Sequence, residues 1–327
     1  MSPENALIEI KDLKKWFPVR TGLLHALRSG EQKYVKAVDG VSFNIRRGEI
    51  YGLAGESGCG KTTTGKVILR LIEPSDGEIL FRGRDVTRLK KREMKEFRRR
   101  AQIIYQDPYE SLDPRMTIFD FVAEPLIVHN IGDIEKNVAD ALERAELVPP
   151  EEYFYRFPHE LSGGQRQRVA IARSMILNPD FVVADEPVSM LDVSIRSSIL
   201  DLMIRLRDDL DISYLYITHD LATANQVCDR IGIMYLGKLV EEADIRELVD
   251  EPLHPYTKAL IAAVPVPDPE AEKSRAVISG EVPNPVNVPP GCRFHPRCAY
   301  AMDICKKEIP ELREVKEDHK VACYLVK

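Results

Sequence analysis

The order of apolar and polar positions predicts that the chain begins with strands. Leu7 to Ile10 and Tyr34 to Ile45 alternate with period two, which is typical of half-buried strands in an antiparallel sheet. Between them, Pro18 to Gln32 is polar and weakly periodic, so we expect an inserted loop. The apolar run Ile50 to Ala54 predicts a buried strand that leads into a helix beginning near Thr62.

The pattern then predicts an α/β core that is interrupted by helices. Further strands and helices are expected at Gly77 to Arg82, Ala101 to Gln106, Phe181 to Asp185, Ile195 to Arg207 and Ser213 to Thr218, followed by a hairpin of Arg230 to Tyr235 and Lys238 to Glu241. Between about 116 and 178 the spacing is helical, at Ile134 to Leu147 and Arg166 to Leu177, with breaks at Pro125 and Pro149-Pro150. The expected fold class is α/β, with a parallel core sheet, an antiparallel β subdomain and an inserted helical subdomain.

Composition limits the classes of function. The 327 residues carry a formal charge of -6, which argues against a nucleic-acid binder that works through net positive charge. The basic run Lys90 to Arg92 and Arg98 to Arg100 is interrupted by Glu93 and Glu96, so a solvated helix face is favoured over a nucleic-acid or lipid contact. No stretch is apolar enough to span a bilayer and none resembles a signal peptide, which predicts a cytosolic chain.

The C-terminal part differs in composition from the rest. Prolines are frequent between Pro265 and Pro290, which predicts a semi-rigid linker, and the last 36 residues contain four of the six cysteines. We expect a domain at 1–252 and a small extension at 253–327. Cysteines of a cytosolic chain serve as core residues or metal ligands more often than as disulfides. Cys59 and Cys228 are interpreted as structural.

One short segment indicates nucleotide binding. It stands between the predicted strand and helix and reads Gly55, Glu56, Ser57, Gly58, Cys59, Gly60, Lys61, Thr62, Thr63. Glycines allow the backbone to fold tightly around a phosphate, a lysine reaches the terminal phosphates, and a hydroxyl at Thr62 can ligate Mg²⁺. The strand before this loop and the helix after it make a chance match improbable. We therefore predict that the loop binds a nucleoside triphosphate.

Two carboxylates and a glycine-rich helix start extend this prediction. Asp185 and Glu186 end an apolar strand, where the first can hold Mg²⁺ and the second can orient and deprotonate a water. Solvated carboxylates are the alternative. Leu161 to Gln165 precedes a long helix, and Ser162, Gly163 and Gly164 can form an N-terminus that binds an anion, or simply a good helix start.

Taken in order, these motifs resemble the nucleotide-binding subunit of an ATP-binding cassette (ABC) transporter. Leu161 to Gln165 is similar to the signature motif of that family, and Ser189 to Asp192 to its D-loop. The resemblance implies that Gln106 is the Q-loop glutamine and that His219 is the switch histidine, although a lone histidine after a strand is usually only packed or solvated. It further implies Mg²⁺ ligation by Thr62, Gln106 and Asp185.

The resemblance also implies how ATP is bound and hydrolysed. Lys61, Gln106, Glu186 and His219 would be catalytic, and Phe17 would stack on adenine, unless Trp16 and Phe17 only fill the edge of the core. Ser162, Gly163, Gly164 and Gln165 of one subunit would complete the ATP site of another. Hydrolysis would then require a dimer of identical or related ATPase subunits.

The end of the chain narrows the resemblance to oligopeptide and dipeptide importers. Leu253 to Leu260 and the segment Gly291 to Cys298 resemble that group, whose members include importers of nickel and oligosaccharides. The implied activity is ATP hydrolysis coupled to peptide import. The implied partners are two membrane permeases and, indirectly, a solute-binding protein, with the ATPase on the cytoplasmic face of the membrane. A soluble ABC ATPase of translation or repair, and an ATP-binding clamp without turnover, are alternatives.

Four cysteines make the extension a candidate metal site. Cys292, Cys298, Cys305 and Cys323 are separated by five, six and seventeen residues, unlike the close pairs of structural zinc sites. The resemblance favours a 4Fe–4S cluster, with zinc and then free thiols as alternatives. His295 and His319 are considered as substitute ligands, and a surface position is favoured for both.

Overall fold

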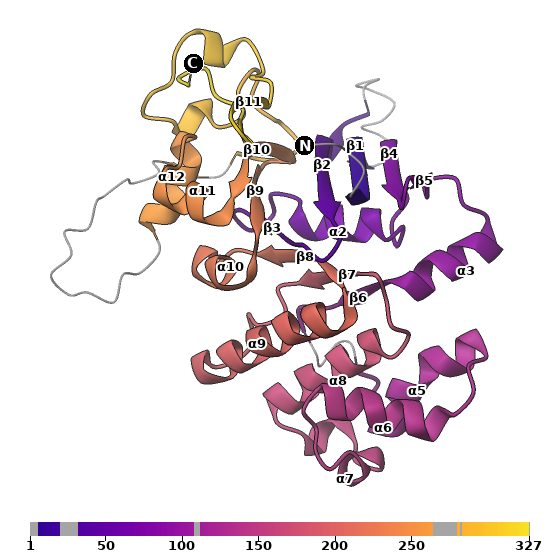
Figure 1. The fold of residues 1–327 in the computed structure, drawn as a ribbon. Coiled ribbons are helices and arrows are strands. Elements are labelled where there is room, and N and C mark those ends of the chain that lie inside the picture. Colours follow the sequence, from indigo (N-terminus) through magenta and orange to yellow (C-terminus); the bar gives the residue numbers. More distant parts are fainter. Residues whose placement is uncertain (1–5, 20–31, 108–111, 264–279, 282, 327) are drawn as a thin grey trace, which may run out of the picture. The chain divides into compact units, whose positions relative to one another are not determined.

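The computed structural model describes residues 6–19, 32–107, 112–263, 280–281 and 283–326, and they form two compact units (Figure 1). The first unit comprises residues 1–7, 45–50 and 88–217, and the second comprises residues 8–44, 51–87 and 218–327. Most of the loop expected at Pro18 to Gln32 and of the proline-rich linker lies outside the described residues.

An antiparallel sheet belongs mainly to the second unit. Its strand order is β2 (Tyr34–Arg46), β1 (Ala6–Pro18), β4 (Asp76–Phe81) and β5 (Arg84–Asp85). Ile8 of β1 pairs with Phe81 of β4, and both side chains are buried. The antiparallel subdomain predicted from the period-two pattern is therefore confirmed, and β1 extends well beyond the predicted Ile10.

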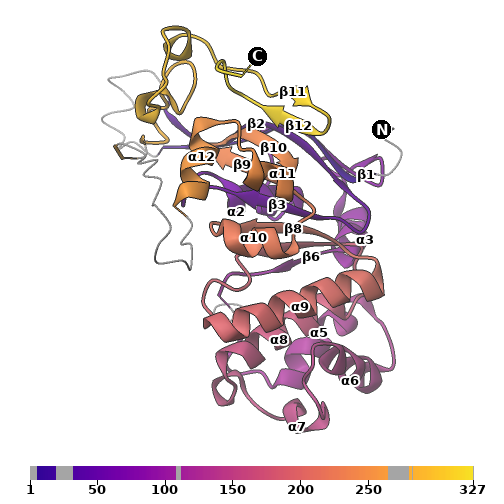
Figure 2. The same cartoon turned by 60° about the vertical axis from the view of Figure 1, so that its left-hand side comes forward.

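The second unit also contains strands from both ends of the chain. β3 (Ile50–Ala54) pairs in parallel with β9 (Arg230–Tyr235), which forms the predicted hairpin with β10 (Lys238–Asp244). The last strands, β11 (Arg313–Lys316) and β12 (His319–Val321), extend the sheet beyond β10 (Figure 2). The unit also contains the helices α2 (Lys61–Ile68), α10 (Leu221–Val227), α11 (Ile245–Asp250) and α12 (Pro255–Ala262), and the short turns η3 (His295–Arg297) and η4 (Ile304–Lys306).

The first unit contains the predicted parallel strands. β6 (Ala101–Ile104), β7 (Phe181–Asp185) and β8 (Ser213–Thr218) lie side by side, and every residue of β7 and β8 is buried. Burial on both faces explains why these strands are continuous apolar runs. Helix α9 (Val193–Leu210) connects β7 to β8, and α3 (Lys91–Arg100) precedes β6. Only Met94 and Phe97 of α3 are buried, so the basic residues occupy a solvated helix face as expected.

The inserted helices of the first unit surround a core of their own. They are α5 (Ile118–His129), α6 (Ile134–Arg144), α7 (Glu151–Phe154), the short turn η2 (Pro158–Glu160) and α8 (Gly163–Met175) (Figure 1). Val122, Val138, Leu142 and Val169 are fully buried in one apolar cluster. The helical region predicted between about 116 and 178 is thus present.

The expected break at Pro125 is wrong, because Pro125 lies buried inside α5. Proline removes one backbone hydrogen bond and costs a helix about 3 kcal/mol. Its neighbours Phe121, Val122 and Leu126 are all buried in the apolar cluster. Burying large apolar side chains contributes about 1.5–3 kcal/mol each, so tertiary packing outweighs the local penalty.

Three smaller predictions also need correction. Gln106 does not end β6 but follows it by two residues, and Cys228, which the sequence places on the helix after His219, instead caps α10 at its C-terminus. Helix α8 begins at Gly163, three residues earlier than the apolar spacing indicates. Glycines at a helix start carry no apolar periodicity, which explains the late prediction.

Candidate ATP site

In the second unit, the predicted phosphate loop connects β3 to α2. Lys61 is 5% exposed, and its Nζ donates hydrogen bonds to the carbonyl oxygens of Gly55 at 2.7 Å and Glu56 at 3.1 Å. The ammonium group is therefore held within the curve of the loop. A lysine at the first position of a helix also places its charge beside the backbone N–H groups of that helix end, which bind anions.

Two glycines of the loop are required for steric reasons. Gly55 has φ 151° and Gly60 has φ 111°. A Cβ atom would lie 2.2 Å from the Met234 carbonyl oxygen at Gly55 and 2.0 Å from the Ala37 carbonyl oxygen at Gly60. Both distances are far below contact, so the backbone of β9 and β2 restricts these positions to glycine. At Gly58, which has φ 77°, an added Cβ atom would meet nothing within 4 Å.

In the first unit, Gln106 and Glu186 meet beyond the ends of two parallel strands. Nε2 of Gln106 donates a hydrogen bond of 3.1 Å to Oε2 of Glu186. Asp185 ends β7 and is 4% exposed, whereas Glu186 has φ 48°. A left-handed conformation is rare for a residue with a side chain and costs about 1–2 kcal/mol. Asp185 is thus buried at the end of the strand, whereas Glu186 is only half-buried.

The predicted signature segment forms a capped helix start in the first unit. Ser162 accepts a hydrogen bond from the backbone N–H of Gln165 at 3.3 Å, and Oε1 of Gln165 accepts one from the N–H of Ser162 at 3.0 Å. This reciprocal pair is a capping box, and it fixes the first turn of α8. A Cβ on Gly164 would lie 2.8 Å from Cγ2 of Ile195, so α8 approaches α9 closely here.

The predicted D-loop, Ser189 to Asp192, and the residue that follows it each expose one apolar side chain. Met190 is 64% exposed and Val193 is 77% exposed, whereas Leu191 between them is buried. Asp192 is the N-cap residue of α9. Two exposed apolar side chains on one turn are a feature of interaction surfaces.

The remaining predicted residues lie in the second unit. His219 is exposed and directly precedes Asp220, whose side chain caps α10 by accepting a hydrogen bond from the N–H of Ala222. Phe17 is half-buried, with Nζ of Lys15 5.0 Å from its ring centre. Trp16 donates from its indole N–H to Asp39 at 2.8 Å. Each unit therefore contains some of the predicted site residues. The side chains of Trp16 and Phe17 are both partly exposed.

Comparison with known proteins shows the family of the chain. Residues 38–189 match the family model described as ABC transporter, and residues 240–305 match the model of the oligopeptide/dipeptide transporter C-terminal region. The oligopeptide transport ATP-binding protein AppF of Bacillus subtilis is 46% identical over 98% of both chains. YkfD of the same organism, also named for oligopeptide transport, is 45% identical over 98% of this chain and 95% of its own. The chain belongs to the ABC transporter ATP-binding family.

Solved structures of ABC proteins confirm the fold class of this ABC ATPase. CbiO1 of Clostridium perfringens, part of a transporter complex, superimposes with a TM-score of 0.64 at 26% identity over 76% of this chain and 92% of its own. The ATP-binding cassette MJ0796, described as a dimer in a post-hydrolysis state with ADP and Pi, gives a TM-score of 0.62 at 30% identity over 73% and 99%. ATP and Mg²⁺ are therefore the expected ligands. None of the helices in the described part of the chain is long and apolar enough to cross a membrane.

None of the six cysteines of this ABC ATPase, all of which are described, forms a disulfide. Among the described residues, no three His, Cys, Asp or Glu side chains gather around a position that could hold a metal ion. Burial raises the pKa of the Cys292 thiol to about 11, and burial also raises the pKa of Cys298 and Cys323. The donors suit a soft metal chemically, but their described positions give no support to the predicted cluster or to zinc.

His319 is not a surface residue, contrary to expectation. Its side chain is 0% exposed, and its two ring nitrogens lie 2.9 Å from carboxylate oxygens of Glu241 and Glu247. Both nitrogens are therefore occupied by carboxylates. Nδ1 of His295 lies 2.8 Å from the Cys292 carbonyl oxygen. His295 thus has a structural partner within the extension, whereas His319 joins the extension to β10 and α11.

The sequence analysis missed the contacts between the extension and the phosphate loop. Arg297 forms an ion pair with Glu56, and the hydroxyl of Tyr256 accepts a hydrogen bond of 2.8 Å from the N–H of Glu56. Tyr256 and Arg297 belong to Leu253 to Leu260 and Gly291 to Cys298. From the sequence, the two segments indicate only a transporter subgroup. Contacts over such separations leave no periodic signal in one sequence.

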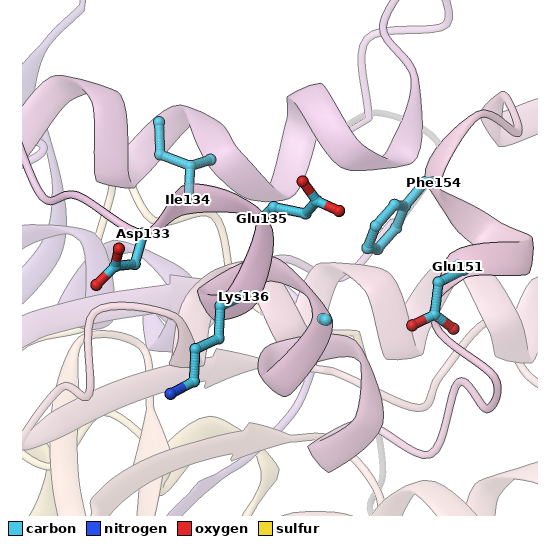
Figure 3. A pocket seen from close by; sticks show the side chains of 7 residues that line it. Asp133, Ile134, Glu135, Lys136, Glu151 and Phe154 are labelled. Atoms are coloured by element: carbon cyan, nitrogen blue, oxygen red, sulfur yellow. The ribbon is translucent and has the colours of Figure 1, made fainter.

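A separate cavity lies among the inserted helices of the first unit. It has a volume of about 480 Å³ and is lined by Asp133, Ile134, Glu135, Lys136, Ala139, Glu151 and Phe154 (Figure 3). Its lining combines charged residues with Ile134, Ala139 and the ring of Phe154. None of the predicted ATP-site residues contributes to it.

Proposed function

We propose that this chain is the ATP-hydrolysing subunit that energises peptide import through a membrane ABC transporter. Its whole-length similarity to proteins named for oligopeptide transport supports the peptide cargo. The match of its C-terminal part to the oligopeptide/dipeptide region supports the same assignment. Nickel or oligosaccharides as cargo are the alternatives within this transporter group.

The hydrogen bond between Gln106 and Glu186 is the observation that carries the hydrolytic role. We propose Glu186 as the general base, because its carboxylate can accept a proton from a water aimed at the γ-phosphate. Gln106 would orient that carboxylate and report the presence of the γ-phosphate. His219 would contact the γ-phosphate from the second unit. Because the proposed base Glu186 is present, ATP hydrolysis is favoured over an ATP-binding clamp without turnover.

The other residues are proposed to bind and position the nucleotide. The loop Gly55 to Thr63 would hold the phosphates, with Lys61 on the terminal ones, and Phe17 would stack on adenine. Thr62, Gln106 and Asp185 would hold Mg²⁺, which neutralises phosphate charge when bound. Ser162 to Gln165 would contact the nucleotide of a partner subunit through the helix N-terminus. Two subunits are thus proposed to close around ATP.

The proposed partners follow from the same assignment. Two permeases would hold the ATPase at the cytoplasmic face of the membrane, and a solute-binding protein would act on the opposite side. The second ATPase would be an identical or a related chain. Ribosomes and DNA-repair proteins would be the partners of a soluble ABC ATPase instead.

Capture of partners from native membranes tests the function. Glu186→Gln is used as bait with MgATP after solubilisation in detergent, with Lys61→Ala as the control that lacks the phosphate-binding lysine. Recovery of multi-span permeases by Glu186→Gln alone is the expected result. Recovery of ribosomal or DNA-repair proteins instead would contradict a transport role. Peptide uptake by the purified complex in vesicles then distinguishes peptides from nickel and oligosaccharides.

We further propose a 4Fe–4S cluster on Cys292, Cys298, Cys305 and Cys323, with zinc as the alternative. Four thiols within one small segment are the donor set that such clusters use. Iron and sulfide are measured after anaerobic purification of the wild type and of the Cys292→Ser, Cys298→Ser double variant. Equal amounts of both in the wild type, lost in the variant, are expected. Stoichiometric zinc without iron in the wild type would exclude the cluster.

A further inference from the structure

The C-terminal extension contacts the phosphate loop through a paired charge. Nη1 of Arg297 donates to Oε2 of Glu56 at 2.7 Å, and Nη2 donates to Oε1 at 3.0 Å. The Arg297 side chain is 7% exposed and that of Glu56 is 24% exposed. A two-point pair between planar groups fixes orientation as well as distance, and partial burial strengthens it. Glu56 stands directly between Gly55 and Ser57 in the loop.

Glu56 is held through its backbone as well. Its N–H donates to the Tyr256 hydroxyl at 2.8 Å, and its carbonyl oxygen accepts from Nζ of Lys61 at 3.1 Å. The rings of Tyr235, Tyr256 and Phe294 pack with centroid separations of 4.8–5.4 Å, and the Arg297 guanidinium lies 5.8 Å from the Tyr235 ring centre. The arginine is therefore packed in a rigid aromatic support.

A second arginine of the extension contacts β2, the neighbour of the strand β1 that carries the candidate adenine-binding residue Phe17. Arg293 donates to the carboxylate of Asp39 and to the carbonyl oxygen of Leu236. Asp39 also accepts the indole N–H of Trp16 at 2.8 Å. Although burial alone would raise the pKa of Asp39, Arg293, Lys238 and Lys36 lower it, so Asp39 stays charged. The extension thus contacts the phosphate loop through Arg297 and, through Arg293, the β2 residue Asp39 that binds Trp16.

We propose that Arg297 is a positioning residue for the nucleotide, acting through Glu56. An unpaired carboxylate at this place in the loop would repel the phosphates of ATP, and the guanidinium neutralises it. The same pair holds the loop in one conformation, so less ordering remains to be done when ATP binds. The C-terminal extension therefore sets the affinity of the phosphate loop for ATP. This inference rests on ATP binding by the loop.

Equilibrium binding of MgATP to the full-length protein tests the proposal. Arg297→Gln should raise the Kd about tenfold, because a charged hydrogen-bonded partner is lost. Arg313→Gln is the matched control, since Arg313 belongs to the same extension but donates to the Val326 carbonyl oxygen and is exposed. It should change the Kd less than twofold. The KM for ATP should rise with the Kd, whereas kcat changes less.

The double variant Glu56→Gln, Arg297→Gln separates positioning from general damage. Removing the carboxylate also removes the repulsion, so the double variant should bind MgATP more tightly than Arg297→Gln alone. Arg297→Lys keeps the charge without the two-point geometry and should lie between wild type and Arg297→Gln. If Arg297→Gln does not fold, the Kd of Arg297→Lys tests the positioning role instead.

Any one of three results would overturn the inference. Equal Kd values for Arg297→Gln and Arg313→Gln would remove any role in ATP binding. A double variant as weak as Arg297→Gln, or an Arg297→Lys variant as tight as wild type, would remove the positioning role. Failure of the wild type to bind MgATP would instead refute the proposed ATPase function, so the two failures are distinguishable.

Discussion

Two glycines with positive φ in the same loop illustrate how close packing constrains a single residue. Gly60 is surrounded by backbone, since a Cβ there would lie 2.0 Å from the Ala37 carbonyl oxygen, whereas the Cβ of Gly58 would meet nothing within 4 Å. Backbone atoms cannot rotate away as a side chain can. The two positions therefore share a conformational preference but differ in the space around them.

At this scale we predict different effects of alanine at the two glycines. Gly60→Ala should abolish MgATP binding and lower the thermal unfolding temperature, because the loop must shift to avoid the clash. Gly58→Ala should cost only about 1–2 kcal/mol of unfolding free energy from its positive φ. Calorimetric unfolding and equilibrium binding measure both. Equal loss of ATP binding in the two variants would contradict the steric argument.

A second prediction concerns the candidate base. Glu186→Gln should lower steady-state ATPase activity by about 10² to 10⁴ while MgATP still binds, because an amide cannot accept the proton of the water. Glu135→Gln, an identical change at an exposed position on α6, should retain full activity. Phosphate release measures turnover. Substantial activity in Glu186→Gln would assign the base to another residue.

Among the elements, β12 depends on a buried histidine that joins it to β10 and α11. Burial alone would lower the pKa of His319, but its hydrogen bonds to Glu241 and Glu247 outweigh burial and raise it. The same contacts help lower the pKa of Glu241 against its own burial. Lys316, 3.8 Å from Glu247, and Glu251, which forms an ion pair with Lys316, are further charged groups near this cluster. The extension is therefore attached to the sheet partly by charge.

The direction of these shifts predicts a pH dependence. A raised pKa means that His319 stabilises the fold fully below the ordinary value of 6.5, and that this contribution is lost as pH rises through the raised pKa. The free energy of unfolding of the wild type should exceed that of His319→Gln by about 1–3 kcal/mol at pH 5–6, and this difference should shrink as the pH rises above that range. Denaturant unfolding at several pH values measures it. A difference that grows with rising pH would contradict the assignment.

Element positions followed from the sequence where local pattern and burial agree. β3, β7 and β8 are continuous apolar runs, and each begins and ends where the pattern predicts. Pro125 shows the opposite case, since a local helix-breaking preference yields to the packing of α5 in a core that no local pattern reveals. Sequence motifs located the phosphate loop and its lysine, but not the partners of Glu56 and His319. Those partners are distant in sequence and depend on the completed fold.

For the whole molecule, the exposed D-loop side chains bear on association. Met190, in the predicted D-loop, and Val193, the first residue of α9, expose 64% and 77% of their surface. In the proposed ATP-bound pair of subunits, this turn would be covered. Leu191, the buried residue between them, holds the turn in place from inside.

This leads to a prediction for the oligomeric state. The Glu186→Gln protein should be a monomer without nucleotide and a dimer with MgATP, and adding Met190→Asp should weaken that dimer about tenfold by placing a charge in the contact. Sedimentation velocity with and without MgATP measures both. Tyr155→Asp, at a ring of the inserted helices that is 83% exposed, is the control and should not alter association. Unchanged dimerisation of the Met190→Asp protein would exclude the D-loop from the interface.

The contact between Arg297 and Glu56 also has a consequence for biosynthesis. The two residues are 241 positions apart, so the ribosome makes the phosphate loop long before the arginine that completes it. If Arg297 sets the affinity for ATP, a growing or prematurely ended chain binds ATP weakly, and tight binding begins only when the last segment has emerged and folded. The order of synthesis would then ensure that only finished subunits consume ATP.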